Sequence, residues 1–199
     1  LTDETATAPN GDRRAQYLAI VADLLPGHLA QVAAAWDPDG GSYRAAFLAA
    51  EPAEGLRRVL TGMIVLSGFE TGGERLQTAF DSADQEDEHS CFSDNTHRDM
   101  VRDIDGILAV FRGVPDTAGH GVRDVIAARD AALAAAIDAR IAESQRLANA
   151  LQPPFDREIR FDNPEGRARI EALIVSLKTQ ESLLEDAFRL FGLDVPAVE

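Results

Sequence analysis

The sequence predicts an all-α protein, an antiparallel bundle of four to five long helices. Alanine and arginine are abundant and aromatic residues make up only 6% of the chain, a composition that favours helices. Apolar residues recur at three- and four-residue steps, which is the period of one helix face. Short clusters of proline, glycine and aspartate separate these periodic segments, as the connections of a bundle do. We therefore expect very little strand.

The length, composition and net charge of the chain restrict the class of protein further. A chain of 199 residues with 45% hydrophobic residues can bury one good core, so a single compact domain is expected. The 34 acidic residues outnumber the 19 basic ones, and the resulting charge of −15 repels phosphate backbones. No nucleic-acid partner is expected. The one cysteine cannot form an internal disulfide. No run approaches the roughly 20 apolar residues of a membrane span, and the first residues do not resemble a signal peptide, so we expect no transmembrane segment and a signal sequence outside this chain.

The first part of the chain predicts an arm and a kinked helix. Residues 1–12 lack periodicity and predict a flexible N-terminal arm, so the helical bundle is expected over 13–199. Pro26 removes a backbone donor and predicts a kink or a short break at 23–27. A turn over 37–41 ends this helix, and a short helical turn follows it. The expected buried stripe of the first helix consists of Tyr17, Ile20, Leu24, His28, Val32 and Trp36.

A long helix is predicted from Pro52 to about Asp81. At 100° per residue, Leu56, Val59, Leu60 and Met63 share its core face. The same face becomes polar further on, at Ser67, Glu70, Glu74, Gln77 and Asp81. Either a bent helix rotates its apolar seam and leaves these carboxylates in solvent, or they belong to a site. Glycines 72 and 73 are expected where a neighbouring backbone or a ligand comes close, or as a region of weak helix propensity.

The second half of the chain predicts three further helices. Ser93 or Asp94 can cap the first, whose stripe runs from Met100 to Phe111 with His97 one step earlier. After a loop at 113–121, residues 122–151 are expected to be helical with a possible break near 129–130. An extended connection at 156–161 then leads to a helix that starts at Asn163-Pro164 and stops at Gly192.

One stretch, residues 86–97, is too rich in polar groups to be a mere connection. It holds three carboxylates before Ser90, two of the four histidines and the only cysteine. Glu70 and Glu74 lie four residues apart on one helix face, so their oxygens could meet an imidazole from this stretch, with Glu86, Glu88, Asp94 or His97 as further ligands. A solvated acidic turn is the competing interpretation of the run from Asp84 to Glu88. A nucleophilic Cys91 paired with His89 or His97 is a minor alternative.

Several catalytic patterns are absent from the sequence. No Glu-x-x-His pair lies on a predicted helix, so the di-iron bundle pattern is missing. The zinc-peptidase motif His-Glu-x-x-His and the Cys-x-x-Cys motif occur nowhere. The sequence therefore does not favour an enzyme.

Residues 85–97 (QEDEHSCFSDNTH), preceded by Gly73-Glu74-Arg75, closely resemble the signature of the imelysin family, also known as the M75 peptidases and including iron-regulated protein A. Residues 14–18, 23–25 and 43–45 resemble that family in the same order. The family's other motif, Gly-x-His-x-x-Glu, is absent here. The resemblance therefore implies that this chain corresponds to the second half of the family domain, with the N-terminal half as a separate or cleaved chain and a partner.

The resemblance also implies a location and a site. It points to a protein of the periplasm or cell envelope that is linked to iron uptake and binds a metal or a small ligand, with iron or another divalent metal as the expected cofactor. The expected metal ligands are Glu74 and His89. The expected pocket residues, with Arg75 and Asp94 as an ion pair, are Glu70, Arg75, Asp94, Asn95 and His97. The alternatives are a metallopeptidase, as the family's catalogue name implies, and a purely structural or interaction bundle.

Overall fold

The computed structural model describes residues 8–114 and 120–195, and all regular secondary structure in these residues is helical. This confirms the predicted all-α class. The chain divides into two compact units, Leu1–Gly55 and Leu56–Glu199. The predicted arm over 1–12 lies mostly outside the described residues, and the first described helix begins at Gly11.

The first unit contains α2 (Gly11–Ala35) and α3 (Ser42–Ala49). The ring of Trp36, after α2, packs against Tyr43 and Phe47 of α3 with centroids 4.9 and 5.4 Å apart. The helix α2 continues through Pro26, so the break allowed for at 23–27 does not occur. A proline removes only one backbone donor, and the helical hydrogen bonds on either side of it persist.

The apolar stripe of α2 is not covered within this unit. None of its residues is buried, because the short helix α3 covers too little of it. By length and composition, α2 is the one described helix that could cross a membrane, with a mean hydropathy of 1.5 in its most apolar window. No such helix was predicted from the sequence, since the window owes its hydropathy partly to alanine. Signal sequences and core helices of soluble proteins pass the same test.

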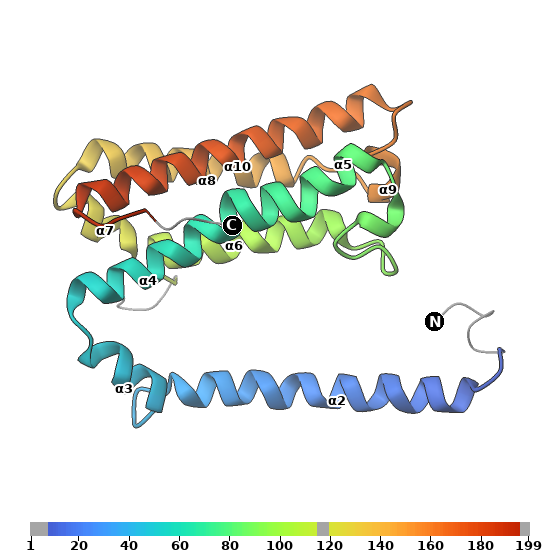
Figure 1. Ribbon diagram of the computed structural model, residues 1–199, viewed down its shortest axis with the longest axis horizontal. Helices are drawn as coiled ribbons and strands as arrows, with labels where there is room; N and C mark the ends of the chain where they lie inside the picture. The colour runs from blue at the N-terminus through green and yellow to red at the C-terminus, as the bar shows by residue number, and fades with distance from the viewer. Residues whose placement is uncertain (1–7, 115–119, 196–199) are drawn as a thin grey trace. The chain divides into compact units, whose positions relative to one another are not determined.

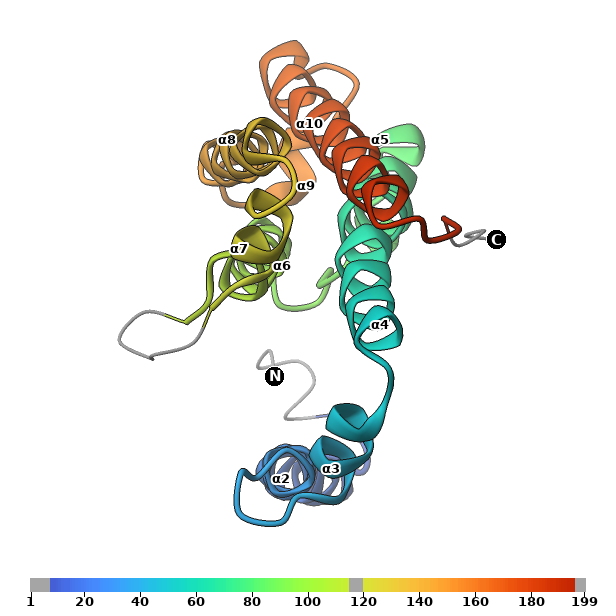
Figure 2. The same cartoon turned by 90° about the vertical axis from the view of Figure 1, so that its left-hand side faces the viewer.

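In the described part of the second unit, four helical runs form an antiparallel bundle (Figure 1). The first run is continuous through α4 (Pro52–Ile64), the π-helix η1 (Val65–Gln77) and α5 (Thr78–Ser82). The others are α6 (Thr96–Arg112), α8 (Ala131–Ala148) and α10 (Pro164–Leu190). Each run packs against two others, with α10 between η1 and α8, and α6 between α8 and η1. Figure 2 shows the four runs around one core.

Most of the predicted core stripes lie inside this bundle. The stripe of α6 is buried completely from Met100 to Phe111, as are Ile137 and Ile141 of α8 and Ile170, Leu173 and Leu177 of α10. The predicted break near 129–130 is confirmed: α7 (Val122–Ala127) ends there, and the Asp130 carboxylate caps α8 by accepting a hydrogen bond from the Leu133 amide at 2.9 Å. The predicted cap at Asn163 is also confirmed.

Two local predictions were wrong. The connection expected to be extended contains the short helix α9 (Phe155–Glu158), which is held because Phe155 and Ile159 are buried and Glu158 makes an ion pair with Arg169 at 2.5 Å. The residue that precedes α6 is Asn95, rather than Ser93 or Asp94. Asp94 has a φ of 50°, in the left-handed region, and this turn leads into the helix one residue later than expected.

Candidate functional site

The polar half of the long first run is a π-helix. In η1 the backbone hydrogen bonds join residues five apart, so the residues of one face are spaced more widely than in an α-helix. Its buried positions follow this spacing, with Ser67 above Gly72 and Thr71 above Leu76. The assumed 100° per residue therefore fails here. Ser67 is buried in the core while Glu74, predicted to share its face, is exposed.

One group of polar side chains ties η1 to α6, and we call it the η1–α6 clamp: Glu70, Thr71, Arg75 and Asp103. Arg75 Nη1 donates to Asp103 Oδ2 at 2.5 Å, and Thr71 Oγ1 donates to the same oxygen at 3.1 Å. Arg75 Nη2 lies 3.5 Å from Glu70 Oε2. The Arg75 and Asp103 side chains are only 22% and 19% exposed, so this ion pair is largely removed from water. The predicted partner of Arg75, Asp94, is wrong; that residue lies exposed in the loop before α6.

Two contacts with α10 hold the other side of η1. The Gln180 amide donates to Ser67 Oγ at 2.8 Å, and both side chains are fully buried. Gly68 leaves room for a carboxylate, since a Cβ at this position would lie 1.8 Å from Glu181 Oε2. Burial raises the pKa of Glu181, and the nearby Glu185 raises it further. Both contacts depend on small side chains in η1.

The segment between α5 and α6, residues 85–95, forms a second polar group that we call the motif loop. The residue that organises it is Asp99, in the first turn of α6. The Asp99 carboxylate accepts hydrogen bonds from Ser90 Oγ and from Asn95 Nδ2 at 3.1 Å, and its Oδ2 lies 3.0 Å from His89 Nδ1. Burial alone would raise the pKa of Asp99, but the hydrogen bonds from Ser90 and His89 outweigh this effect and lower it. The imidazole is thereby oriented by a carboxylate at one nitrogen.

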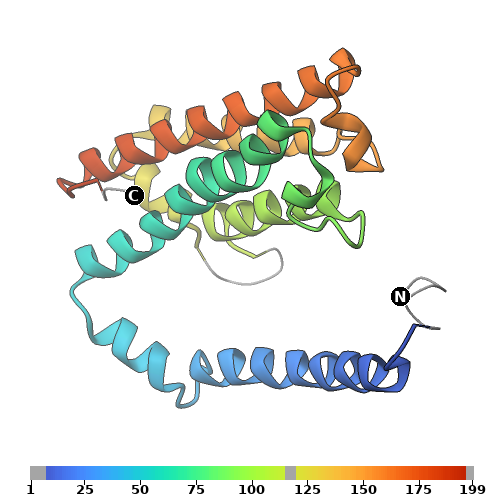
Figure 3. The ribbon, with the colours of Figure 1, turned by 45° about the vertical axis from the view of Figure 1, so that its right-hand side comes forward.

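Glu88 is the buried acid of the motif loop. Its side chain is 4% exposed; Oε2 accepts a hydrogen bond from Thr96 Oγ1 at 3.1 Å, whereas Oε1 is buried without a partner. Burial raises the pKa of Glu88 to about 7, against the hydrogen bond from Thr96, and the negative charges of Asp156 and Asp94 add to the increase. Asp156 belongs to α9, and Figure 3 shows α9 and the motif loop at the same end of the bundle.

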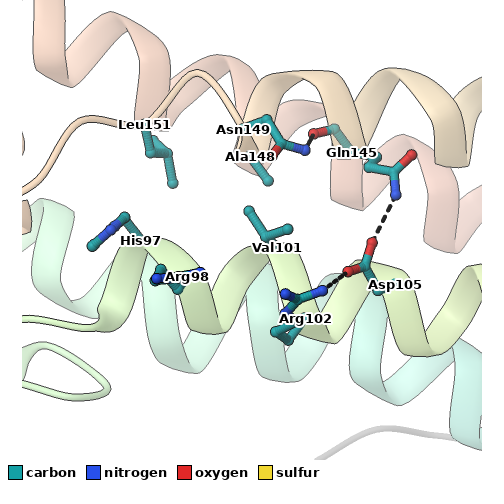
Figure 4. A pocket seen from close by; sticks show the side chains of 9 residues that line it. All are labelled: His97, Arg98, Val101, Arg102, Asp105, Gln145, Ala148, Asn149 and Leu151. Carbon is teal, nitrogen blue, oxygen red and sulfur yellow. Dashed lines mark hydrogen bonds and ion pairs between the residues drawn. The ribbon is translucent and has the colours of Figure 1, made fainter.

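A third group lies between α6 and α8, where a cavity of about 440 Å³ opens beside His97 (Figure 4). Val101 lines it from α6, with Ala148 and Leu151 on the opposite side. His97 Nδ1 is buried and has no hydrogen-bond partner. None of the other predicted site residues lines this cavity.

The predicted site residues are thus divided among separate places. Glu70 and Arg75 lie in the η1–α6 clamp, His89 and Asn95 in the motif loop, and His97 in the cavity. Glu74 and Asp94 are exposed, and no hydrogen bond or ion pair is found for them among the described residues. In the described ranges no three His, Cys, Asp or Glu side chains are grouped so as to hold a metal ion. Glu74 and His89 therefore do not form a metal centre by themselves.

Two aspartates that were not predicted as site residues, Asp99 and Asp103, organise these groups. Both precede residues of the predicted core stripe, Met100 and Ile104, and are partly covered by neighbouring elements. Acids beside a buried stripe, four residues apart, were a usable signal. Asp99 and Asp103 lie two and six residues after the polar stretch 86–97, so they fall outside the segment in which site residues were predicted.

The fold and the polar groups define the class of the protein, which is an all-α bundle. Its clustered polar side chains lie in a π-helix of the first helical run and in the acidic, histidine-containing loop that joins this run to α6. The chain belongs to the imelysin family, since the family model for peptidase M75, described as Imelysin, matches residues 2–184. No curated protein matches the chain.

Proposed function

We propose that this chain is a ligand-binding bundle of an imelysin-type protein of the periplasm or cell envelope, linked to iron uptake. Its ligand is a metal or an iron-containing molecule, bound at the polar surface of η1 and the motif loop and shared with an N-terminal bundle. The observation that supports the proposal is the π-helix η1, which coincides with the acidic part of the first helical run. π-helical segments are rare and frequently lie at functional sites.

The surroundings of η1 show that its unusual winding is stabilised from several sides. The ion pair of Arg75 with Asp103 holds it against α6, and Gln180 holds it against α10. A helical winding with poorer hydrogen-bond geometry persists only where contacts with the surrounding structure stabilise it. The result is an ordered frame beside Glu74, which keeps an exposed carboxylate.

His89 is oriented in the way that metal-binding histidines usually are. Its Nδ1 lies 3.0 Å from Asp99, which leaves Nε2 without a partner among the described residues. A carboxylate behind the imidazole sets the orientation of the ring. Because Glu74 and His89 supply only single donors, the remaining ligands would come from the N-terminal bundle or from the iron-containing molecule itself.

Calorimetric titration of the purified chain with ferrous chloride under anaerobic conditions, and with zinc chloride, tests the metal assignment. Glu74→Gln and His89→Gln should each weaken binding about tenfold or more, as removal of a donor does. Glu171→Gln, an exposed carboxylate on α10, is the matched control and should bind as the wild type does. Unchanged affinity in both test variants, or an equal loss in the control, would sink the assignment.

A structural role of the motif loop is the second candidate, favoured by the closed hydrogen-bond group around Asp99. Under this alternative His89→Gln lowers the thermal unfolding temperature, while neither metal changes that temperature in the wild type. Stabilisation of the wild type by either metal, lost in Glu74→Gln, excludes the purely structural role.

A further inference from the structure

We infer that the cavity between α6 and α8 binds a small hydroxylated organic acid with two or more carboxylates. This site is independent of the proposed metal site, because the cavity contains neither Glu74 nor His89. Its volume of about 440 Å³ suits a small organic molecule.

The charges at the cavity favour an anion. His97, Arg98 and Arg102 line it together with a single acid, Asp105. Both oxygens of that acid are already engaged: Oδ2 accepts from Arg102 at 2.8 Å and Oδ1 accepts from Gln145 at 2.7 Å, as Figure 4 shows. Arg98 has no side-chain partner in the described ranges and is exposed. In a chain of net charge −15, this cavity is lined by more positive than negative charge.

Two features of His97 and Arg98 are unfavourable without a ligand. The buried Nδ1 of His97 has no partner, and an unsatisfied buried polar atom costs free energy. Arg98 also occupies the first turn of α6, where the positive end of the helix dipole disfavours a cation and Asp99 is the one acid. Nor does the Asn95 side chain cap this end, because it donates to Asp99 instead. A carboxylate in the cavity, beside Arg98, would offset the cost at the start of α6.

The spacing of the polar groups favours more than one carboxylate. Arg98 and Arg102 are one helical turn apart on α6, so their guanidinium groups can pair with two carboxylates of one small molecule. Gln145 of α8 and Asn149, which follows α8, are likewise four residues apart and line the same cavity; Asn149 Nδ2 donates to the Gln145 backbone oxygen at 2.8 Å, so the two amide oxygens are the groups left to bind a ligand. Their amides suit hydroxyl groups. The apolar lining, with Val101 on one side and Ala148 and Leu151 on the other, suits a short carbon chain.

Calorimetry on the full chain in a buffer free of carboxylates tests this inference, with malate and citrate as the anionic probes. The neutral analogue 1,2,4-butanetriol and inorganic phosphate are the comparison probes. We expect malate or citrate to bind, and Arg98→Gln to weaken this binding about tenfold. Asn149→Asp, which adds a negative charge at an exposed position of the cavity, should weaken it at least as much. Neither residue is buried, so both variants should fold.

Arg123→Gln is the matched control, because Arg123 is an exposed arginine of α7 outside the cavity and the charge change is the same. Retained affinity in this control, with the loss in Arg98→Gln, supports the site. An equal loss in both variants would mean attraction by overall charge and would overturn it. So would phosphate or the triol binding as tightly as malate, or no binding of either acid at about 10 mM.

Discussion

The η1–α6 clamp and the motif loop are each organised by an aspartate of α6, and these aspartates are four residues apart, yet the two groups respond differently to pH. In the clamp, Asp103 faces the guanidinium of Arg75, which is charged at every pH at which a protein folds. Asp99 instead faces an imidazole and a hydroxyl, and residues 85–97 contain no lysine or arginine. The loop also buries Glu88 without a cation. Whether a permanently charged side chain lies beside the acid therefore decides which contacts persist when the pH changes.

The largest effect is expected from Glu88 at alkaline pH. Its folded-state pKa is about 7 and its ordinary value 4.5, so the folded state binds this proton more tightly than the unfolded state does. Glu88 therefore costs no stability below about pH 4.5 and destabilises the fold increasingly as the pH rises through 7, by about 3 kcal/mol at pH 8. Glu88→Gln keeps an acceptor for Thr96 and should remove this dependence in urea unfolding at pH 5 and pH 8. Parallel pH profiles of this variant and the wild type would contradict the assignment.

A smaller effect, independent of pH between 5 and 8, is expected in the η1–α6 clamp. Asp103→Ala leaves Arg75 largely buried without its closest acceptor and should lower the free energy of unfolding by about 2 kcal/mol. The control is Asp138→Ala, which breaks the more exposed ion pair with Arg112 and should cost less than about 1 kcal/mol. Equal losses in the two variants would show that the clamp is no stronger than a surface pair.

The smallest effect is expected from Asp99, because its partners lie nearer the surface. Asp99→Ala should cost about 1 kcal/mol at pH 6 and release the motif loop, which hydrogen exchange of the Ser90 and Cys91 amides can report. The pKa of Asp99 is lowered, so its contribution is present above its ordinary value of 3.8 and is lost as the pH falls through the folded value. The penalty of the variant should therefore shrink in strong acid. A penalty that grows on acidification would refute this account.

The helices that the sequence predicted best are those whose apolar spacing is regular and whose ends carry cap residues. In α10 the cap at Asn163 and the stripe through Leu173 and Leu177 agree with the structure, because local propensity and core packing favour the same element. The equally clear stripe of α2 has no cover in its own unit. Periodicity predicts a helix and its apolar face, but it does not identify what packs against that face.

The site was predicted less completely, for reasons that lie in η1. Gly72 was expected either where a neighbour comes close or as a region of weak helix propensity; a Cβ there would lie 3.4 Å from the Cβ of Leu177, an ordinary van der Waals contact. The π-helical winding of η1 could not be predicted, because helical faces were assigned with 3.6 residues per turn. That period places Ser67 and Glu74 on one face. Arg75 was paired with the wrong acid, since its partner Asp103 lies beyond the polar stretch.

The winding of η1 also determines how this chain can tolerate changes of length. With the wide winding kept, deleting one residue between 67 and 74 would turn everything after the deletion by the angle of one residue relative to what precedes it. Arg75 would leave Asp103, while Leu66 and Leu60 before the deletion kept their places in the core. A single-codon deletion would therefore damage the clamp far more than most single substitutions in the same helix.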